Sequence, residues 1–230
     1  LIHMGRKDFQ VKIRGYRIEV AEIEIALFDH ADIKEAVVVA REDRRGDKRL
    51  VAYLVPAGQP APTVSELRRA LAETLPDYMI PSVFVTLDAL PLTPTNKIDR
   101  RALPAPGTAR PELENPFVAP RTPVEQTLVN IWSQVLGLDQ VGIHDNFFEL
   151  GGHSLLATQI TARMLNIFRV EVPLRSFFQS PTVADMAVVV VQSQIEKAGS
   201  EHIDRMLAEL ESLSDEEARR FLADESTKEI

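Results

Sequence analysis

A proline-rich segment divides this chain into two parts. Five prolines stand between Leu103 and Thr122, at Pro104, Pro106, Pro111, Pro116 and Pro120. Each proline fixes its φ angle and lacks an amide hydrogen, so the segment cannot form a regular helix or an inner strand and favours a stiff, extended connection. The chain has 230 residues, which leaves room for an ordinary domain on each side. We therefore expect a linker at residues 105–120.

The part before the linker has the pattern of a small α+β subdomain, a short sheet with packed helices. Residues 9–14 and 16–20 alternate apolar and polar side chains around Gly15, which predicts a hairpin. Runs rich in Val and Ile at 33–41 and 50–56 flank a polar turn and predict two paired strands. Helices are predicted at 22–30 and 63–75, the second with Ser65 as its cap, and a short strand at 82–87.

The part after the linker is predicted to be all-α. Thr122-Pro123-Val124-Glu125 has the cap, proline and acidic residue of a helix start. Further helices are expected from Ser154, near 174–178, and from Thr182 to about Gln194. They would form a four-helix bundle at residues 121–197. Residues 201–225 predict two more amphipathic helices, with an apolar stripe of Ile203, Met206, Leu210 and Leu213 and a cap at Ser214.

Composition excludes several classes of function. The chain has no cysteine, which excludes disulfides and thiolate metal sites and suits a reducing, cytoplasmic compartment, and we expect no metal site. No apolar run approaches the length of a membrane span. The net charge is −8, which argues against nucleic acid as a partner. Much of this surplus lies in residues 201–230, either as a solvated helix face or as a docking surface.

One serine stands out within the sequence Asp-Asn-Phe-Phe-Glu-Leu-Gly-Gly-His-Ser-Leu at residues 145–155. Ser154 lies at the start of a predicted helix, where it is either a plain N-cap or a functional hydroxyl. Its neighbour His153 cannot face it on a helix as a catalytic base, and the G-x-S-x-G pattern of hydrolases is absent. A helix N-terminus does suit a phosphate diester. The sequence thus favours a serine that another enzyme modifies.

These residues resemble the motif of the peptidyl carrier domains of nonribosomal peptide synthetases. The resemblance covers roughly residues 120–195, including Trp132, Gly142, Phe177 and Pro181. It implies that a separate phosphopantetheinyl transferase attaches 4'-phosphopantetheine from coenzyme A to Ser154, and that the arm's thiol then holds an aminoacyl or peptidyl thioester. Phe147, Phe148 and Leu150 are expected in the core, with at least one of Leu155 and Leu156.

Residues 5–104 carry a second resemblance, to the C-terminal subdomain of adenylation domains. It rests on residues 5–19, similar to the hinge and hairpin, and on residues 91–100, similar to the lysine loop. The resemblance implies Lys97 as a catalytic cation that bridges carboxylate and phosphate, with ATP and Mg²⁺ as cofactors. It also implies Asp8 as the hinge and Gly15 as the loop beside the pantetheine arm. From local pattern alone, Asp8 and Gly15 could be turn residues and Lys97 an exposed lysine.

In the lysine loop, the family's usual glycine before the lysine is replaced by Asn96. Asparagine tolerates the left-handed backbone conformation better than most residues. We therefore expect the shape of the loop to be retained.

We accordingly expect a piece of a nonribosomal peptide synthetase that lacks the adenylation core and cannot adenylate an amino acid alone. Expected partners are that core, the transferase, the amino-acid substrate and a condensation or other downstream domain. The helical tail at 201–225 would either dock on a neighbouring domain or chain or pack on the carrier. Two alternatives are an acyl carrier of a hybrid polyketide line and an interaction module whose serine stays unmodified.

Overall fold

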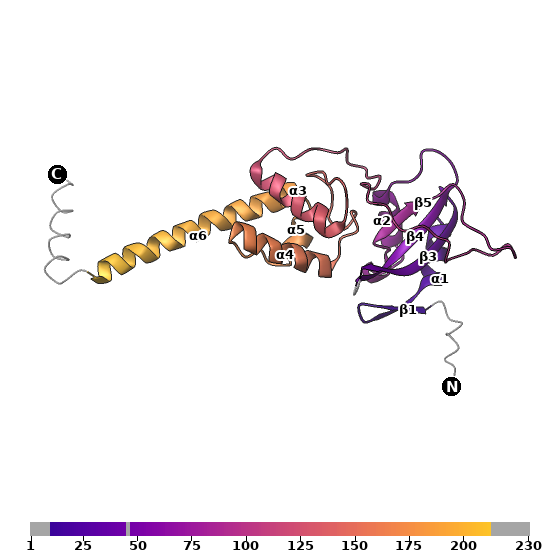
Figure 1. The fold of residues 1–230 in the computed structure, drawn as a ribbon, viewed down its shortest axis with the longest axis horizontal. Coiled ribbons are helices and arrows are strands. Elements are labelled where there is room, and N and C mark those ends of the chain that lie inside the picture. Colours follow the sequence, from indigo (N-terminus) through magenta and orange to yellow (C-terminus); the bar gives the residue numbers. More distant parts are fainter. Residues whose placement is uncertain (1–9, 45–46, 213–230) are drawn as a thin grey trace, which may run out of the picture.

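The computed structural model describes residues 10–44 and 47–212. A small sheet with packed helices is followed by a helical region, which confirms the expected fold class (Figure 1). The two regions lie next to each other, and a long helix extends away from the carrier on the side opposite the sheet. The far end of this helix therefore lies away from the junction between the regions.

The predicted hairpin is present at the N-terminal end of the described chain. Strand β1 (Gln10–Ile13) pairs antiparallel with β2 (Tyr16–Glu19) through a two-residue turn. Arg14 and Gly15 have φ angles of 48° and 88°, as turns of the primed types require, because their twist matches that of the flanking strands. Gly15 satisfies this requirement without strain, whereas Arg14 adopts a conformation that L-residues rarely take.

The main sheet has the order β3-β4-β5. Strands β3 (Ile33–Arg44) and β4 (Asp47–Pro56) pair, as predicted, and run antiparallel, whereas β5 (Val83–Thr86) is parallel to β4. Helices α1 (Val20–Phe28) and α2 (Val64–Ala72) bury their apolar sides in one cluster with alternate residues of the strands. The other face of β4 packs on Leu90 and Leu103, so β4 is buried on both sides. A 3₁₀ turn follows α2 at Asp77–Met79.

The cap of α2 differs from the prediction. Thr63, not Ser65, is the N-cap, and it forms a capping box with Glu66. The Thr63 hydroxyl accepts a hydrogen bond from the Glu66 amide, and the Glu66 carboxylate accepts one from the Thr63 amide. The Thr-x-x-Glu spacing carries this signal. Ser65 is instead a buried side chain inside the first turn.

The proline-rich segment has no helix or strand, as expected, but it is fixed at both ends. Leu103 is buried against the sheet, and the Tyr53 hydroxyl donates a 2.6 Å hydrogen bond to the carbonyl oxygen of Pro104. At its carrier end, Thr108 donates to Asp139, and the Asp139 amide donates to the Thr108 carbonyl oxygen. Hydrogen bonds therefore hold the segment against both the subdomain and the helical region.

The carrier region contains helices α3 (Pro123–Leu136), α4 (Ser154–Phe168), α5 (Ser176–Gln179) and the start of α6 (Val183–Ser212). Its core is built around Trp132, with Phe147 packed edge-on at 5.2 Å and Phe177 stacked at 5.9 Å between ring centroids. The predicted core residues Phe147 and Leu150 are buried, and Phe148 packs against the same cluster. Of the two leucines after Ser154, Leu156 is buried and Leu155 is exposed.

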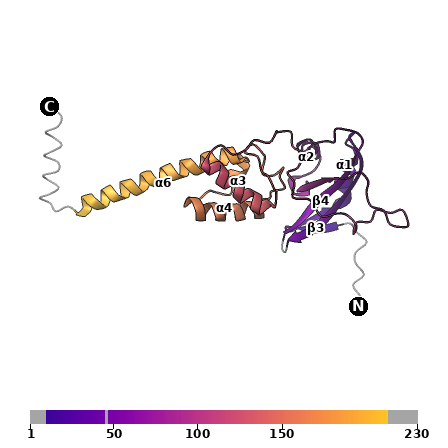
Figure 2. The same ribbon diagram turned by 45° about the horizontal axis from the view of Figure 1, so that its top comes forward.

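Helix α6 is longer than the sequence predicted. It was expected to end near Gln194, but it continues without a break to Ser212 (Figure 2). No proline interrupts it, and Gly199 alone is tolerated within a helix at a cost of about 1 kcal/mol. The first part of the predicted tail thus extends the last carrier helix. The predicted cap at Ser214 and the helix after it lie outside the described residues.

Candidate functional site: the carrier serine and the cavity it faces

Ser154 is the first residue of α4, and His153 occupies the N-cap position. Ser154 is thus not the cap itself. Its side chain is exposed, and within the described chain no group forms a hydrogen bond with its hydroxyl. His153 is buried rather than turned to solvent beside the serine. The site therefore has an accessible hydroxyl and lacks the bonded base that a serine nucleophile needs.

The two glycines before His153 are required by packing. A Cβ atom on Gly152 would lie 2.4 Å from the carbonyl oxygen of Phe147, a distance that no real side chain adopts. Gly151 has a φ of 90°, and its Cβ would lie 3.1 Å from the carbonyl oxygen of Ser82 in the subdomain. The two glycines therefore make room for Phe147 of the carrier and for the backbone at Ser82 of the subdomain.

The loop before Ser154 is fixed by a buried carboxylate. Asp145 is fully buried and accepts a 2.7 Å hydrogen bond from the amide of Gly142. Arg110 of the linker donates to both carboxylate oxygens, from Nε at 2.8 Å and from Nη2 at 2.7 Å. These hydrogen bonds raise the pKa of Arg110 against the opposing effect of its partial burial. The linker thus supplies the countercharge for the loop that presents the serine.

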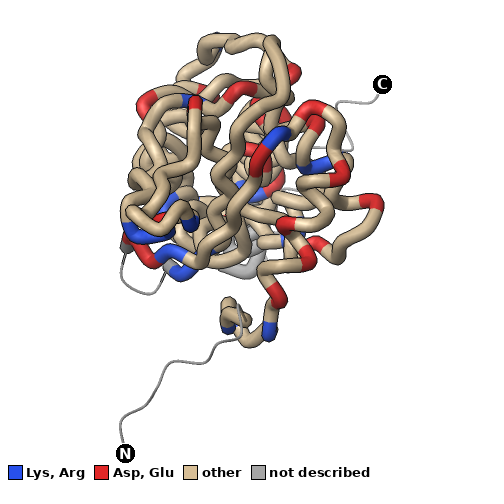
Figure 3. The backbone as a smooth tube through the Cα atoms, turned by 90° about the vertical axis from the view of Figure 1, so that its right-hand side faces the viewer, with Lys and Arg blue, Asp and Glu red and all other residues tan. Residues whose placement is uncertain are grey.

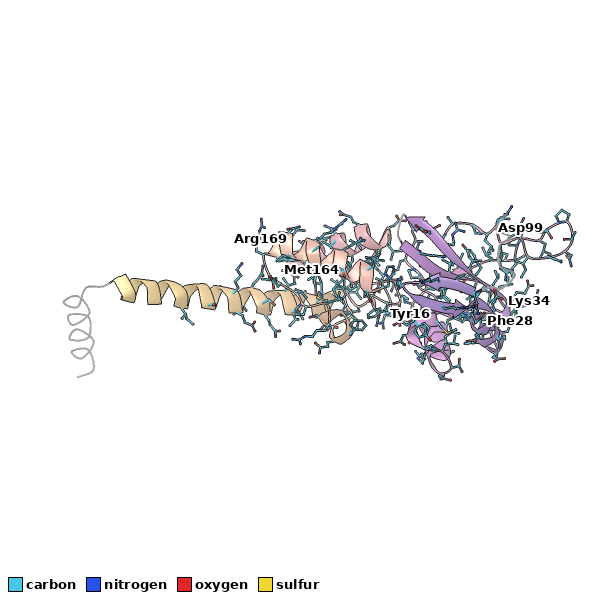
Figure 4. The ribbon with its side chains drawn as sticks, turned by 90° about the horizontal axis from the view of Figure 1, so that it is seen from below. Tyr16, Phe28, Lys34, Asp99, Met164 and Arg169 are labelled. Carbon is cyan, nitrogen blue, oxygen red and sulfur yellow. The ribbon has the colours of Figure 1, made fainter. Side chains whose placement is uncertain are left out.

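A cavity of about 610 Å³ lies between the carrier and the subdomain, and Ser154 is part of its wall. The carrier side also includes Phe148, Glu149 and His153. The subdomain side includes the hairpin turn through Arg14 and Tyr16, and the first turns of α2. In Figure 4, Tyr16 lies on the side of the subdomain that faces the carrier.

One direct hydrogen bond joins the two regions at this cavity. The buried Ser65 hydroxyl of α2 donates to the Glu149 carboxylate of the carrier at 2.9 Å. Two aromatic pairs flank the space: Tyr16 stacks on Tyr78 at 4.3 Å, and Phe148 packs on Phe178 at 5.2 Å. The cavity therefore offers aromatic walls beside the exposed serine.

The predicted lysine loop lies elsewhere. Thr93 organises it: its amide donates to the Lys97 carbonyl oxygen at 2.7 Å, and its hydroxyl accepts from the Lys97 amide at 3.2 Å. Asn96 has a φ of 59°, so the left-handed conformation expected there is confirmed. The Lys97 side chain is exposed, and its ammonium has no ion-pair partner in the described residues.

The loop is tied to the rest of the subdomain by an ion pair. Arg100 donates to Glu24 of α1 at 3.1 Å, and Glu24 also accepts from the amide of Val38. Figure 4 places Asp99 at the end of the subdomain remote from the carrier, whereas Tyr16 faces the carrier. The hairpin and the lysine loop therefore occupy different sides of the subdomain.

The other predicted site residues are placed as follows. Gly15 forms the hairpin turn next to the cavity, and nothing lies within 4 Å of the position its Cβ would take. Asp8 lies outside the described residues.

Within the described chain, no cluster of His, Asp and Glu could hold a metal ion, and no helix is both long and apolar enough to cross a bilayer. Figure 3 shows both signs of charge on the end of the subdomain that it views.

Sequence reasoning missed three residues: Ser65, which bonds to Glu149 across the cavity, Arg68, which lines the cavity, and Arg110, which ties the linker to the carrier. The local pattern predicts Ser65 as a helix cap, and it predicts ordinary exposed cations at Arg68 and Arg110, because arginine is mostly exposed in proteins. A weak signal existed for Arg110, since it stands alone within a proline-rich stretch before an aspartate-containing loop. Nothing in the local pattern of α2 singles out its contact with Glu149.

Comparison with known families agrees with this arrangement. Residues 126–190 match the family described as phosphopantetheine attachment site, and residues 22–97 match the AMP-binding enzyme C-terminal domain. The chain belongs to the nonribosomal peptide synthetases and comprises the C-terminal subdomain of an adenylation domain and the phosphopantetheine carrier domain. The match to the first of these families indicates a carrier domain for covalent 4'-phosphopantetheine.

Individual relatives give the same picture. The chain is 52% identical over 188 residues to tyrocidine synthase 2 of Brevibacillus parabrevis, covering 81% of this chain and 5% of that protein. It is 45% identical over 219 residues to phosphinothricin tripeptide synthetase PhsB of Streptomyces viridochromogenes, covering 94% of this chain and 18% of that protein. It therefore spans a small part of the curated relatives.

A solved structure is similar to this chain over most of its length. Holo-PA1221, an NRPS protein with adenylation and PCP domains bound to a vinylsulfonamide inhibitor, is 26% identical, with a TM-score of 0.55. The match covers 83% of this chain and 29% of that one.

Proposed function

We propose that Ser154 is the attachment point of 4'-phosphopantetheine and that the carrier holds an aminoacyl or peptidyl thioester on it. The observation that supports this most directly is the exposed Ser154 hydroxyl at the start of α4, without a bonded base, beside a cavity of about 610 Å³. The hydroxyl fits the group, because a phosphodiester formed there would meet the free amides at the N-terminus of α4. When bound, the arm supplies a thiol that this cysteine-free chain lacks.

In this proposal the chain's own residues hold and present the serine. The Arg110–Asp145 ion pair and the packing of Phe147 against Gly152 fix the loop. An outside phosphopantetheinyl transferase supplies the base that removes the serine proton. The Ser154 oxygen forms a bond to the β-phosphorus of coenzyme A as the pyrophosphate bond breaks and adenosine 3',5'-bisphosphate leaves.

The test is to incubate the chain with coenzyme A, Mg²⁺ and a promiscuous phosphopantetheinyl transferase and to measure its intact mass. The wild-type chain is expected to gain one phosphopantetheinyl group, and Ser154→Ala none. Absence of a gain in the wild type would favour the alternative of an unmodified interaction module. A carrier that accepts malonyl rather than aminoacyl groups would favour the polyketide alternative.

We further propose that the subdomain serves adenylation and thiolation in turn within a parent enzyme. Lys97 would bridge the carboxylate and the phosphate of the activated amino acid, with ATP and Mg²⁺ bound mainly by the missing core. Gly15 would lie beside the pantetheine arm during thiolation, and Asp8 would be the hinge. The separate positions of the hairpin and the lysine loop support this proposal, because the subdomain must turn to present each to one core.

Since the adenylation core is absent, we expect no ATP–pyrophosphate exchange by this chain alone. Exchange above background with any of the proteinogenic amino acids would contradict that expectation. Joining the chain to its core should restore exchange, and Lys97→Ala should then reduce it. The relevant partners are the adenylation core, its amino acid, the transferase and a condensation or other downstream domain, in the cytoplasm.

For residues 201–225 we propose docking on a neighbouring domain or chain, with packing on the carrier as the alternative. Of the predicted stripe, Ile203 is the member whose side chain is described, and it is exposed; Val188, Val191 and Ile195, earlier in α6, are exposed as well and support an interaction face. With 3.6 residues per turn, the four side chains point within a sector of about 120° around the helix axis. Deleting residues 201–230 should weaken partner binding while leaving the stability of the carrier unchanged. A loss of carrier stability would support packing instead.

A further inference from the structure

The cavity in front of Ser154 is lined by more positive than negative charge. Four arginines line it, against the two carboxylates Asp77 and Glu149. The arginines are Arg14 of the hairpin turn, Arg49 of β4, and Arg68 and Arg69 of α2. The unmodified Ser154 hydroxyl carries no charge that could balance them.

Arg68 is the arginine whose charge is least compensated. It is half-buried in α2, and its Nη1 donates to the carbonyl oxygen of Pro81 at 3.0 Å. No carboxylate of the described residues lies within ion-pair distance of it; Glu149 and Asp77 act on it only from farther away. Burial lowers the pKa of Arg68. A guanidinium withdrawn from water without a bonded anion is unfavourable, unless an anion enters the same space.

Arg49 adds a second donor to the same wall. Its side chain is 17% exposed, and Nη2 lies 3.5 Å from Asp43, a long contact. Its Nε atom is buried and has no hydrogen-bond partner in the described chain. By contrast, Arg69 is exposed and forms an ion pair with Glu114 of the linker. Among these three arginines, Arg68 therefore has no carboxylate partner in the described chain, Arg49 has a long contact and an unused Nε, and Arg69 has a short ion pair.

We infer that Arg68, supported by Arg49, binds the phosphodiester that joins the arm to Ser154 and thereby holds the loaded carrier on the subdomain. The inference rests on the proposed modification of Ser154, because that modification places one negative charge at the cavity wall. Arginine suits the role, since its fork of donors matches the geometry of phosphate oxygens. Ser65 and Glu149 set the orientation of docking, and the phosphodiester strengthens it.

This arrangement couples modification to docking. The unloaded carrier leaves Arg68 without an anion, so the docked state is weaker and Ser154 is more available to the transferase. The loaded carrier brings its own countercharge and favours the position that faces the hairpin. By thermodynamic linkage, the factor by which loading favours docking equals the factor by which docking favours the loaded form over the unloaded form.

The test measures docking as a distance between two spin labels. Because the chain has no cysteine, Lys34→Cys on the subdomain and Glu171→Cys on the carrier, both exposed in the wild type, can be labelled uniquely in the unloaded protein. The transferase then attaches an arm from acetyl coenzyme A, whose thiol is blocked, and intact mass confirms loading. Pulsed electron spin resonance gives the ratio of the narrow, docked population to the broad, undocked one.

In the otherwise wild-type chain, loading is expected to raise this ratio about tenfold, within the range of hydrogen bonds to charged groups. Arg68→Gln should abolish the rise while leaving the ratio of the unloaded protein within about twofold. Arg68→Lys should retain part of the rise. Arg163→Gln is the matched control: Arg163 is likewise a helical arginine, but it lies on α4, is bonded to Gln134 and does not line the cavity.

An equal rise on loading in wild type and Arg68→Gln would overturn the inference, as would no rise in the loaded wild type. Adding inorganic phosphate to the unloaded protein tests whether a free anion has the same effect as the phosphodiester of the arm. A rise as large as that from loading, at millimolar phosphate, would show a general anion site and contradict a role specific to the arm. If no mass is gained at all, the proposed function fails as well, so the two failures are distinguishable.

Discussion

Arg110 and Asp145 form a two-pronged ion pair that joins the linker to the loop before Ser154. The two contacts are 2.8 Å and 2.7 Å long, and Asp145 is fully buried. Arg110 also donates to the carbonyl oxygen of Asn115, which holds the linker in a turn against the carrier. The linker segment near Arg110 is therefore a structural part of the carrier rather than a free tether.

Replacing Arg110 should destabilise the carrier more than replacing any exposed cation. Arg110→Ala leaves the Asp145 carboxylate buried with only the Gly142 amide as a partner, which we expect to cost about 3 kcal/mol. Urea unfolding followed by the fluorescence of Trp132 measures it. Arg163→Ala should cost less than about 1 kcal/mol. If Arg110→Ala and Arg163→Ala cost the same, the ion pair is not structural; adding Asp145→Asn to Arg110→Ala should recover part of the loss.

Acid should weaken the first helix of the carrier through Glu125. The hydrogen bond from Arg121 lowers the pKa of Glu125 below its ordinary value of 4.5, against the opposing effect of burial. A carboxylate with a lowered pKa in the folded state stabilises it above pH 4.5, and this contribution is lost as the pH falls through the lowered value. Glu125→Gln should thus cost about 1 kcal/mol at pH 7 and progressively less below pH 4.5. A cost that is independent of pH would contradict this role for the charge.

The glycine before His153 should tolerate no side chain. Gly152→Ala places a Cβ atom 2.4 Å from the carbonyl oxygen of Phe147, and we expect a loss of about 3 kcal/mol in the same unfolding assay. Gly199→Ala is the matched control, because nothing lies within 4 Å of that position in the interior of α6. It should raise helix content slightly, since alanine favours a helix by about 1 kcal/mol over glycine. Equal losses for both variants would disprove the steric argument.

Local patterns in the sequence predicted most of the elements and the serine. The Thr122-x-x-Glu125 spacing gave the start of α3, and the alternation around Gly15 gave the hairpin, because both signals act within a few residues. Ser154 could be singled out because a specific motif surrounds it. The exposed Leu155 and the buried Leu156 could not be told apart by periodicity alone.

Local sequence patterns could not predict the contacts between segments that lie far apart in the chain. Ser65 and Glu149 are 84 positions apart, and Arg110 and Asp145 are 35 apart, so no local period connects them. The unbroken run of α6 escaped prediction for another reason: residues 196–202 contain no apolar side chain larger than alanine and include Gly199, so the apolar pattern is interrupted there although the helix continues. Long-range pairs and exposed helix extensions both escape hydrophobic patterning.

The lysine loop should accept glycine at position 96 but not a larger apolar residue. Asn96 has a φ of 59°, where an ordinary L-residue is disfavoured by about 1–2 kcal/mol. Asn96→Gly should leave adenylation by the parent enzyme within about twofold, whereas Asn96→Val should reduce it about tenfold by displacing Lys97. Pyrophosphate exchange on the chain joined to its core measures both. Equal rates for the two variants would show that the left-handed turn does not position the lysine.

The most direct test of the account is to locate the modification within the chain. No lysine or arginine lies between Arg121 and Arg163, so trypsin releases Ser154 on a single peptide, residues 122–163. After treatment with coenzyme A and the transferase, fragmentation of that peptide should place one phosphopantetheinyl group on Ser154 and leave Ser133 unmodified. A modification mapped to any other residue, or a gain that persists in Ser154→Ala, would contradict the account.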